Sequence, residues 1–192
     1  MSLISERAGA RLLERHGLSL SASQHLLATG IAGAPIRLES VTLYESELIR
    51  DVATRPSITL EEFDDAFPTG VAVARLPRGR TISAAAEWPD TADQLAGPWR
   101  IGNGDAFVMT GTVAFGEGLS IVLSVSGFLL AAARITALLA GDGPGSVRFD
   151  LAAPGSAWDA IRGRRMRGHR GRPVELVGWR VRPGTARLPV QL

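Results

Sequence analysis

The sequence predicts an α+β fold, with a small helical part followed by an antiparallel β part. Two observations lead to this prediction. Residues 1–70 contain short apolar stretches with helical spacing, whereas the long apolar run at residues 106–140 begins with side chains that alternate along the chain. The break Pro68-Thr69-Gly70 places a soft boundary near Gly70, so the expected parts are residues 1–70 and residues 71–192.

The first part is expected to contain short helices around one hairpin. Apolar positions, glycine stops and a capping box predict four helices: residues 8–16, a second from a cap at Ser21 or Ser23 to Gly30, residues 45–53, and a fourth opened by Thr59-Leu60-Glu61-Glu62. Between the second and third helices, residues 36–38 and 41–44 predict a pair of short strands around Glu39-Ser40.

The apolar run predicts a three-stranded antiparallel meander. Asn103-Gly104, a strong hairpin signal, separates residues 99–101 from a strand at 107–115, and Gly116-Glu117-Gly118 provides the turn into a strand at 121–125. Alternation gives the meander a hydroxyl face that includes Thr110, Thr112 and Ser124. Its opposite, apolar face is expected to be buried and to consist of Phe107, Met109, Val113, Phe115, Ile121, Leu123 and Val125.

The end of the apolar run, residues 128–139, fits both a helix face and a strand, and a strand running into a bend is slightly favoured. A membrane span is rejected because Arg134 lies well inside the run, where a charge costs roughly 2.5–3.5 kcal/mol near the centre of a membrane helix. The remaining predicted elements are a strand at 71–76, a helical turn at 91–95, a hairpin turn at 141–145, a strand at 146–151, a short helix near 156–163 and a final strand at 174–181.

The composition is that of a globular protein and excludes cysteine chemistry. With no cysteine in the chain, disulfides, thiolate zinc sites and a cysteine nucleophile are all ruled out. Residues 1–17 carry charges throughout and show no apolar signal core, so we expect a cytoplasmic protein. The net charge of +2, with histidines counted as neutral, does not by itself require a nucleic-acid partner.

Charge is divided unevenly along the chain. All 21 Lys+Arg residues are arginines. Up to Gly70 the chain has six arginines and ten acidic residues, and from Val71 onward it has fifteen arginines and nine acidic residues. The densest basic segment is residues 162–172, the arginine loop, which combines arginines, one histidine and glycines that allow close approach to an anion. Its candidate phosphate-binding residues are Arg162, Arg164, Arg165, Arg167, His169, Arg170 and Arg172. The alternative is a solvated loop whose arginines cap the preceding helix and pair with acidic residues of the first part.

Residues 18–56 carry a second pattern: Ser21-x-Ser23, Leu26-Leu27, Gly30, Pro35-x-Arg37, Leu43-Tyr44, Leu48 and Val52. This pattern resembles the winged-helix domain of the excisionase and MerR-type families, in which a helix, a recognition helix, a short wing and a further helix follow in order. The resemblance implies DNA binding, with Arg37 in the wing. The residues from Gly30 to Pro35 leave no room for a recognition helix at the matching place.

Two functional hypotheses follow. The first is a non-enzymatic, DNA-associated regulator that contacts phosphates through Arg37 and the arginine loop. The second is a small-ligand-binding or enzymatic β-barrel that uses the hydroxyl face of the meander and the loops around Asp105 and Gly141. No metal-ligand spacing connects the three histidines, no catalytic motif is present, and no cofactor is expected. A homo-oligomer is compatible with either hypothesis.

Overall fold

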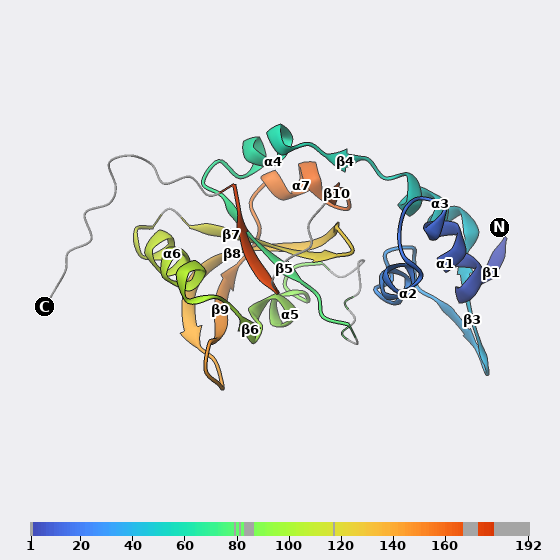
Figure 1. The fold of residues 1–192 in the computed structure, drawn as a ribbon, viewed down its shortest axis with the longest axis horizontal. Coiled ribbons are helices and arrows are strands. Elements are labelled where there is room, and N and C mark those ends of the chain that lie inside the picture. The colour runs from blue at the N-terminus through green and yellow to red at the C-terminus, as the bar shows by residue number, and fades with distance from the viewer. Residues whose placement is uncertain are drawn as a thin grey trace, which may run out of the picture.

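The computed structural model describes residues 2–78, 80, 82, 87–116, 118–166 and 173–178. Its helices and antiparallel strands confirm the α+β fold (Figure 1). A small N-terminal part holds β1 to α3, and a larger part is built around a mixed sheet. Among the described residues, no helix has the length and apolarity needed to cross a membrane.

The N-terminal part combines a helical pair with a three-stranded antiparallel sheet in the order β1-β3-β2. Its buried residues include Leu13, Leu27 and Ile49, which come from all three helices. The predicted strand pair at residues 36–44 is confirmed. The elements are β1 (Leu3–Ser5), α1 (Glu6–Glu14), α2 (Leu20–Ala28), β2 (Ile36–Leu38), β3 (Val41–Glu45) and α3 (Ser46–Thr54).

Serine caps begin both helices of the pair. Ser5 accepts a hydrogen bond from the Ala8 amide, and Ser19 accepts one from the Ala22 amide. The prediction of a cap at Ser21 or Ser23 was therefore wrong, because α2 begins one residue after Ser19. Between the helices, Gly17 adopts a φ of 85°, a left-handed conformation that glycine accepts without steric cost.

The second part is organised on a sheet in the order β11-β5-β7-β8-β10-β4, with β9 paired to β8 and β6. The strands β7, β8 and β9 form an antiparallel meander, whereas β5 runs parallel to β7. The strands are β4 (Ser57–Ile58), β5 (Val71–Arg75), β6 (Trp99–Arg100), β7 (Leu119–Val125), β8 (Phe128–Ala140), β9 (Ser146–Ala152), β10 (Arg165–Met166) and β11 (Val174–Val177). The helices are α4 (Leu60–Ala66), α5 (Ala92–Ala96), α6 (Asn103–Ala114) and α7 (Ala157–Ile161).

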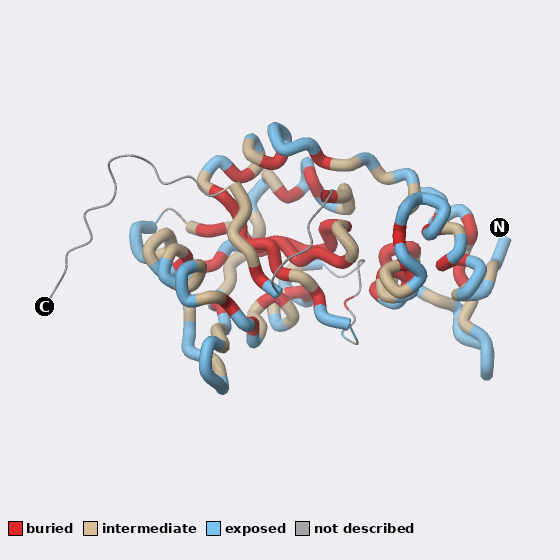
Figure 2. Tube along the Cα trace, viewed as in Figure 1, coloured by how far each residue is buried: buried red, intermediate tan, exposed pale blue. Residues whose placement is uncertain are grey.

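Helices cover both faces of this sheet, so its central strands are buried on both sides (Figure 2). On one face, Ile121 and Leu123 join a cluster that includes residues of α5 and α6. On the other face, Val122 packs in a cluster with Phe63 of α4 and with residues of α7. In Figure 1, α4 and α7 lie above β7 and β8, and α5 lies below them. Burial on both sides explains why β7 and β8 are almost continuously apolar.

The predicted strand at residues 107–115 was wrong, because this segment is helix α6. Met109 is fully buried, and Ala106 and Val113 pack beside it, a spacing of three and four residues that fits a helix. Phe107 and Phe115 were expected in the core but are 65% and 59% exposed. Asn103-Gly104, expected in a hairpin turn, begins this helix instead.

The predicted hydroxyl face is not formed. Thr110 and Thr112 donate hydrogen bonds to the carbonyl oxygens of Ala106 and Val108, four residues earlier in α6. Ser124 lies on β7 and is buried. These hydroxyl groups therefore do not line a common wall, and a ligand-binding barrel built on them loses its basis.

The chain begins to pack with the second part before the expected boundary at Gly70. The strand β4 pairs in parallel with β10, and α4 packs against α7, so residues 57–66 belong with the sheet. The Thr59 and Glu62 capping box predicted for α4 is present. The N-terminal part is joined to the second part by Arg55 and Pro56.

Candidate functional site

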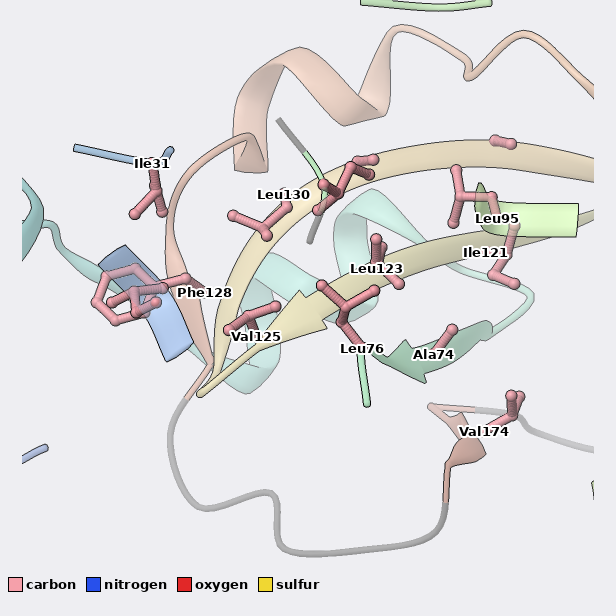
Figure 3. Close-up of a cluster of buried hydrophobic side chains, with 14 of the residues drawn as sticks. Ile31, Ala74, Leu76, Leu95, Ile121, Leu123, Val125, Phe128, Leu130 and Val174 are labelled. Atoms are coloured by element: carbon pink, nitrogen blue, oxygen red, sulfur yellow. The ribbon is translucent and has the colours of Figure 1, made fainter. Parts of the chain in front are cut away.

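The two parts meet where α2 approaches the turn between β7 and β8. Ser126 Oγ in that turn donates a hydrogen bond to the Ala22 carbonyl oxygen, at 3.3 Å. His25 Nε2 lies 3.4 Å from the Arg80 carbonyl oxygen. Ile31 and Phe128 belong to one buried cluster that extends along the sheet (Figure 3). The junction is therefore held by apolar burial and by hydrogen bonds to backbone carbonyls.

A cleft of about 530 Å³ opens at this junction. The backbones of Gly30, Gly33 and Gly163 form part of its lining, and three arginines, Arg55, Arg162 and Arg164, line it as well. Two of these arginines were candidates from the sequence. Arg55 was missed, because it lies 108 residues away from Gly163, which it contacts in the arginine loop.

Arg55 links the connection between the parts to the segment after α7. Its Nη1 donates to the Gly163 carbonyl oxygen at 3.4 Å. Burial lowers the pKa of the Arg55 guanidinium, and the nearby Asp51 carboxylate partly offsets that effect. Gly163 has a φ of 70°, and a Cβ there would lie 2.9 Å from Arg55 Nη1. The positive φ favours glycine at this position, and an added Cβ would also require the end of the flexible Arg55 side chain to shift.

Arg162 and Arg164 each hold a carboxylate. Arg162 Nη2 lies 2.7 Å from Glu87 Oε1. Arg164 Nη2 lies 2.9 Å from both Glu62 oxygens and also donates to the Ser57 carbonyl oxygen. The Arg164 Nε is buried and has no hydrogen-bond partner among the residues that the structure describes.

Arg165 contacts both parts of the protein. Its guanidinium carbon lies 5.5 Å from the centroid of the Phe128 ring, a cation–π arrangement, and its Nη1 donates to the His16 carbonyl oxygen. The Arg164–Glu62 pair joins the same segment to α4, so both arginines are already engaged within the protein. The other candidates, Arg167, His169, Arg170 and Arg172, lie outside the described residues.

Arg37 does not join this group. It is exposed on β2, whose hairpin with β3 projects away from β10 at the opposite side of the N-terminal part (Figure 1). The structure therefore brings Arg162 and Arg164 to one cleft and places Arg37 elsewhere.

The comparisons with known proteins give no relatives. No family model, no curated protein and no solved structure matches the chain. Functional conclusions therefore rest on the residues themselves.

A second basic surface was missed by the sequence analysis. Arg7, Arg11 and Arg15 follow one another at every fourth position of α1 and its C-terminal end, and Arg50 of α3 lies across from them. All four are exposed and line a groove of about 390 Å³. Within the described part of the chain, none of them forms an ion pair. The four-residue spacing was the signal in the sequence that could have revealed this surface.

The pairing of Glu62 predicts a specific dependence of stability on pH. The Thr59 amide and then the Arg164 guanidinium lower the pKa of Glu62 from its ordinary value of 4.5. The folded protein therefore gains stability from this carboxylate above about pH 4.5 and loses that gain as the pH falls through the lower folded pKa.

Replacing Glu62 with glutamine keeps an acceptor for the capping box but removes the charge. Urea unfolding should show Glu62→Gln less stable than the parent near neutral pH, with the difference shrinking at about pH 3. Glu61→Gln is the matched control, since Glu61 forms no ion pair with any described residue. An equal, pH-dependent loss in both variants would contradict the assignment to the Arg164 pair.

Proposed function

We propose that this protein binds duplex DNA through phosphate contacts made by its N-terminal part. The observation that carries the proposal is the arginine groove formed by Arg7, Arg11, Arg15 and Arg50. Its guanidinium groups are exposed and lack carboxylate partners among the described residues, so their charge is available to a phosphate backbone.

The order of elements supports the same proposal. The helices α1 and α2 are followed by the β2–β3 hairpin, by Tyr44 at the end of β3 and by α3, which is the order of the winged-helix families. With α1 as the first helix, α2 takes the place of the recognition helix, and residues 30–35 need not contain one. The sequence pattern had instead taken α2 as the first helix. In helix-turn-helix proteins the first helix crosses the phosphate backbone, which fits the arginines on α1.

The exposed face of α2 has few side chains that can form hydrogen bonds with base edges. Leu20, Gln24 and Ala28 are its exposed residues, and only Gln24 has a side chain that forms hydrogen bonds. Specific readout relies on several such contacts to base edges, whereas phosphate contacts carry no sequence information. The proposed binding is therefore directed at phosphates and largely independent of sequence, with Arg37 on the hairpin adding a contact.

Fluorescence anisotropy with a short labelled duplex tests this function across a range of salt concentrations. Each phosphate neutralised contributes a slope of roughly 0.9 in the logarithm of affinity against the logarithm of salt. The triple variant Arg7→Gln, Arg11→Gln, Arg15→Gln should flatten that slope by roughly 2–3 units if all three residues touch phosphate.

The matched control carries Arg78→Gln, Arg100→Gln and Arg148→Gln. These arginines are also exposed but belong to the second part, so the variant changes the net charge equally and leaves the groove intact. Its slope should stay close to that of the parent. Equal flattening in both triple variants, or no duplex binding by the parent at low salt, would refute the proposed function.

A further inference from the structure

The cleft at the junction has the dimensions and lining of a small-molecule site, separate from the arginine groove. Its volume of about 530 Å³ falls within the range of ordinary ligand sites. Residues of both parts line it: Gly30, Ile31 and Arg55 come from the N-terminal side, and Leu130 and Gly163 come from the sheet side.

The charges of the cleft favour an anion. Three arginines line the cleft, and two of them form an ion pair with a carboxylate, Arg162 with Glu87 and Arg164 with Glu62. Arg55 forms no ion pair with any described residue; its Nη1 donates to the Gly163 carbonyl oxygen, and the Asp51 carboxylate acts on it at longer range. Arg164, whose buried Nε has no hydrogen-bond partner among the described residues, also belongs to the lining. Partly burying a guanidinium charge is costly unless it is paired, and a bound anion would offset that cost.

The rest of the lining is apolar. Ile31, Pro56, Leu129 and Leu130 contribute hydrocarbon surface, and the three glycines leave space beside the guanidinium groups. An anion alone would leave this surface in contact with water. A ligand with an anionic end and an apolar body would bury it as well.

We infer that the junction cleft binds a small phosphate monoester with an apolar body. A phosphate group offers three terminal oxygens, and guanidinium groups such as those of the lining arginines match it with paired N–H donors. Because the lining comes from both parts, the ligand stabilises the junction between them and raises the melting temperature of the whole chain. This site does not depend on the proposed DNA binding.

Phenyl phosphate is a suitable probe, measured by isothermal titration calorimetry and by thermal unfolding of the full chain. Phenyl phosphate should bind and raise the melting temperature, whereas phenol should do neither. Inorganic phosphate should bind more weakly than phenyl phosphate, because it leaves the apolar wall uncovered.

Arg55→Gln should weaken phenyl phosphate binding by about tenfold or more through loss of a charge-assisted contact. Arg162→Gln tests the same site with a more exposed residue, in case Arg55→Gln fails to fold. Arg148→Gln, the same change on exposed β9, should bind as the parent does.

Several outcomes would overturn the inference. One is that phenyl phosphate does not bind, and another is that phenol or inorganic phosphate binds as well as phenyl phosphate does. A third is that Arg55→Gln and Arg162→Gln both bind phenyl phosphate with the affinity of the parent. Displacement of phenyl phosphate by duplex DNA would assign the cleft to nucleic-acid phosphates instead. Unchanged duplex binding by Arg55→Gln, together with lost phenyl phosphate binding, is the expected result and separates the two sites.

Discussion

Replacing Phe128 with alanine is expected to lower the free energy of unfolding by about 3–5 kcal/mol, one of the two largest effects we expect. Phe128 begins β8, is 1% exposed and lies in the cluster that joins Ile31 to the sheet. Its removal would leave a cavity at the junction and would also remove the ring over which Arg165 lies. Chemical denaturation followed by circular dichroism measures the loss.

Phe107→Ala is the matched control, since it deletes the same side chain from the exposed face of α6. It should cost under about 1 kcal/mol, in line with other surface substitutions. Equal losses for Phe107→Ala and Phe128→Ala would show that residues 107–115 are buried after all, as the strand prediction required.

Gly127→Ala is expected to destabilise the protein by about 2–5 kcal/mol. Gly127 has a φ of 88°, where an alanine is strained, and its added Cβ would lie 2.6 Å from the Met166 carbonyl oxygen. The Met166 amide also donates to the Gly127 carbonyl oxygen at 2.7 Å, so the two backbones cannot separate without losing that bond. Thermal and urea unfolding both report the effect.

Gly116→Ala separates backbone strain from the short contact of the added Cβ, the two causes of the loss expected for Gly127→Ala. Gly116 follows α6 with a φ of 76°, and an added Cβ there meets nothing within 4 Å. Its replacement should cost only the backbone strain, roughly 1–2 kcal/mol. If Gly127→Ala cost no more than Gly116→Ala, the close approach of the β7–β8 turn to β10 would be incorrect.

Local signals in the sequence predicted much of the fold. The Thr59 and Glu62 capping box, the hairpin around Glu39-Ser40 and the strand at 121–125 depend on neighbouring residues, and the structure has all three. Residues 128–139 were ambiguous between helix and strand, and β8 confirms the favoured strand. Its first six residues, 128–133, are all buried, which explains why they show no clear alternation.

The segment at 107–115 shows where a period of two misleads. Phenylalanine, methionine and valine alternate there with threonine and alanine, yet the stripe of Ala106, Met109 and Val113 has helical spacing. Both patterns are present in the same residues. Packing of Met109 against the sheet decides between them, and that contact is not visible in the sequence.

The candidate site was predictable only in part. Arg162 and Arg164 were found through their density in the sequence, but their partners Glu87 and Glu62 lie far away along the chain. Arg55 was found only in the structure, since its place in the cleft depends on how the two parts meet. Charge density thus located the arginines, whereas folding determined that several are already engaged.

The pairing of β4 with β10 affects the order in which the protein folds during its synthesis. All strand pairs of the N-terminal sheet lie within residues 3–45, so that unit can assemble soon after it leaves the ribosome. Ser57, in contrast, meets Arg164 across a separation of 107 residues. At translation rates of roughly 5–20 residues per second, the nascent chain waits roughly 5–20 seconds before this edge of the sheet can close. The junction cleft, which needs the same late segment, is therefore among the last features of the molecule to form.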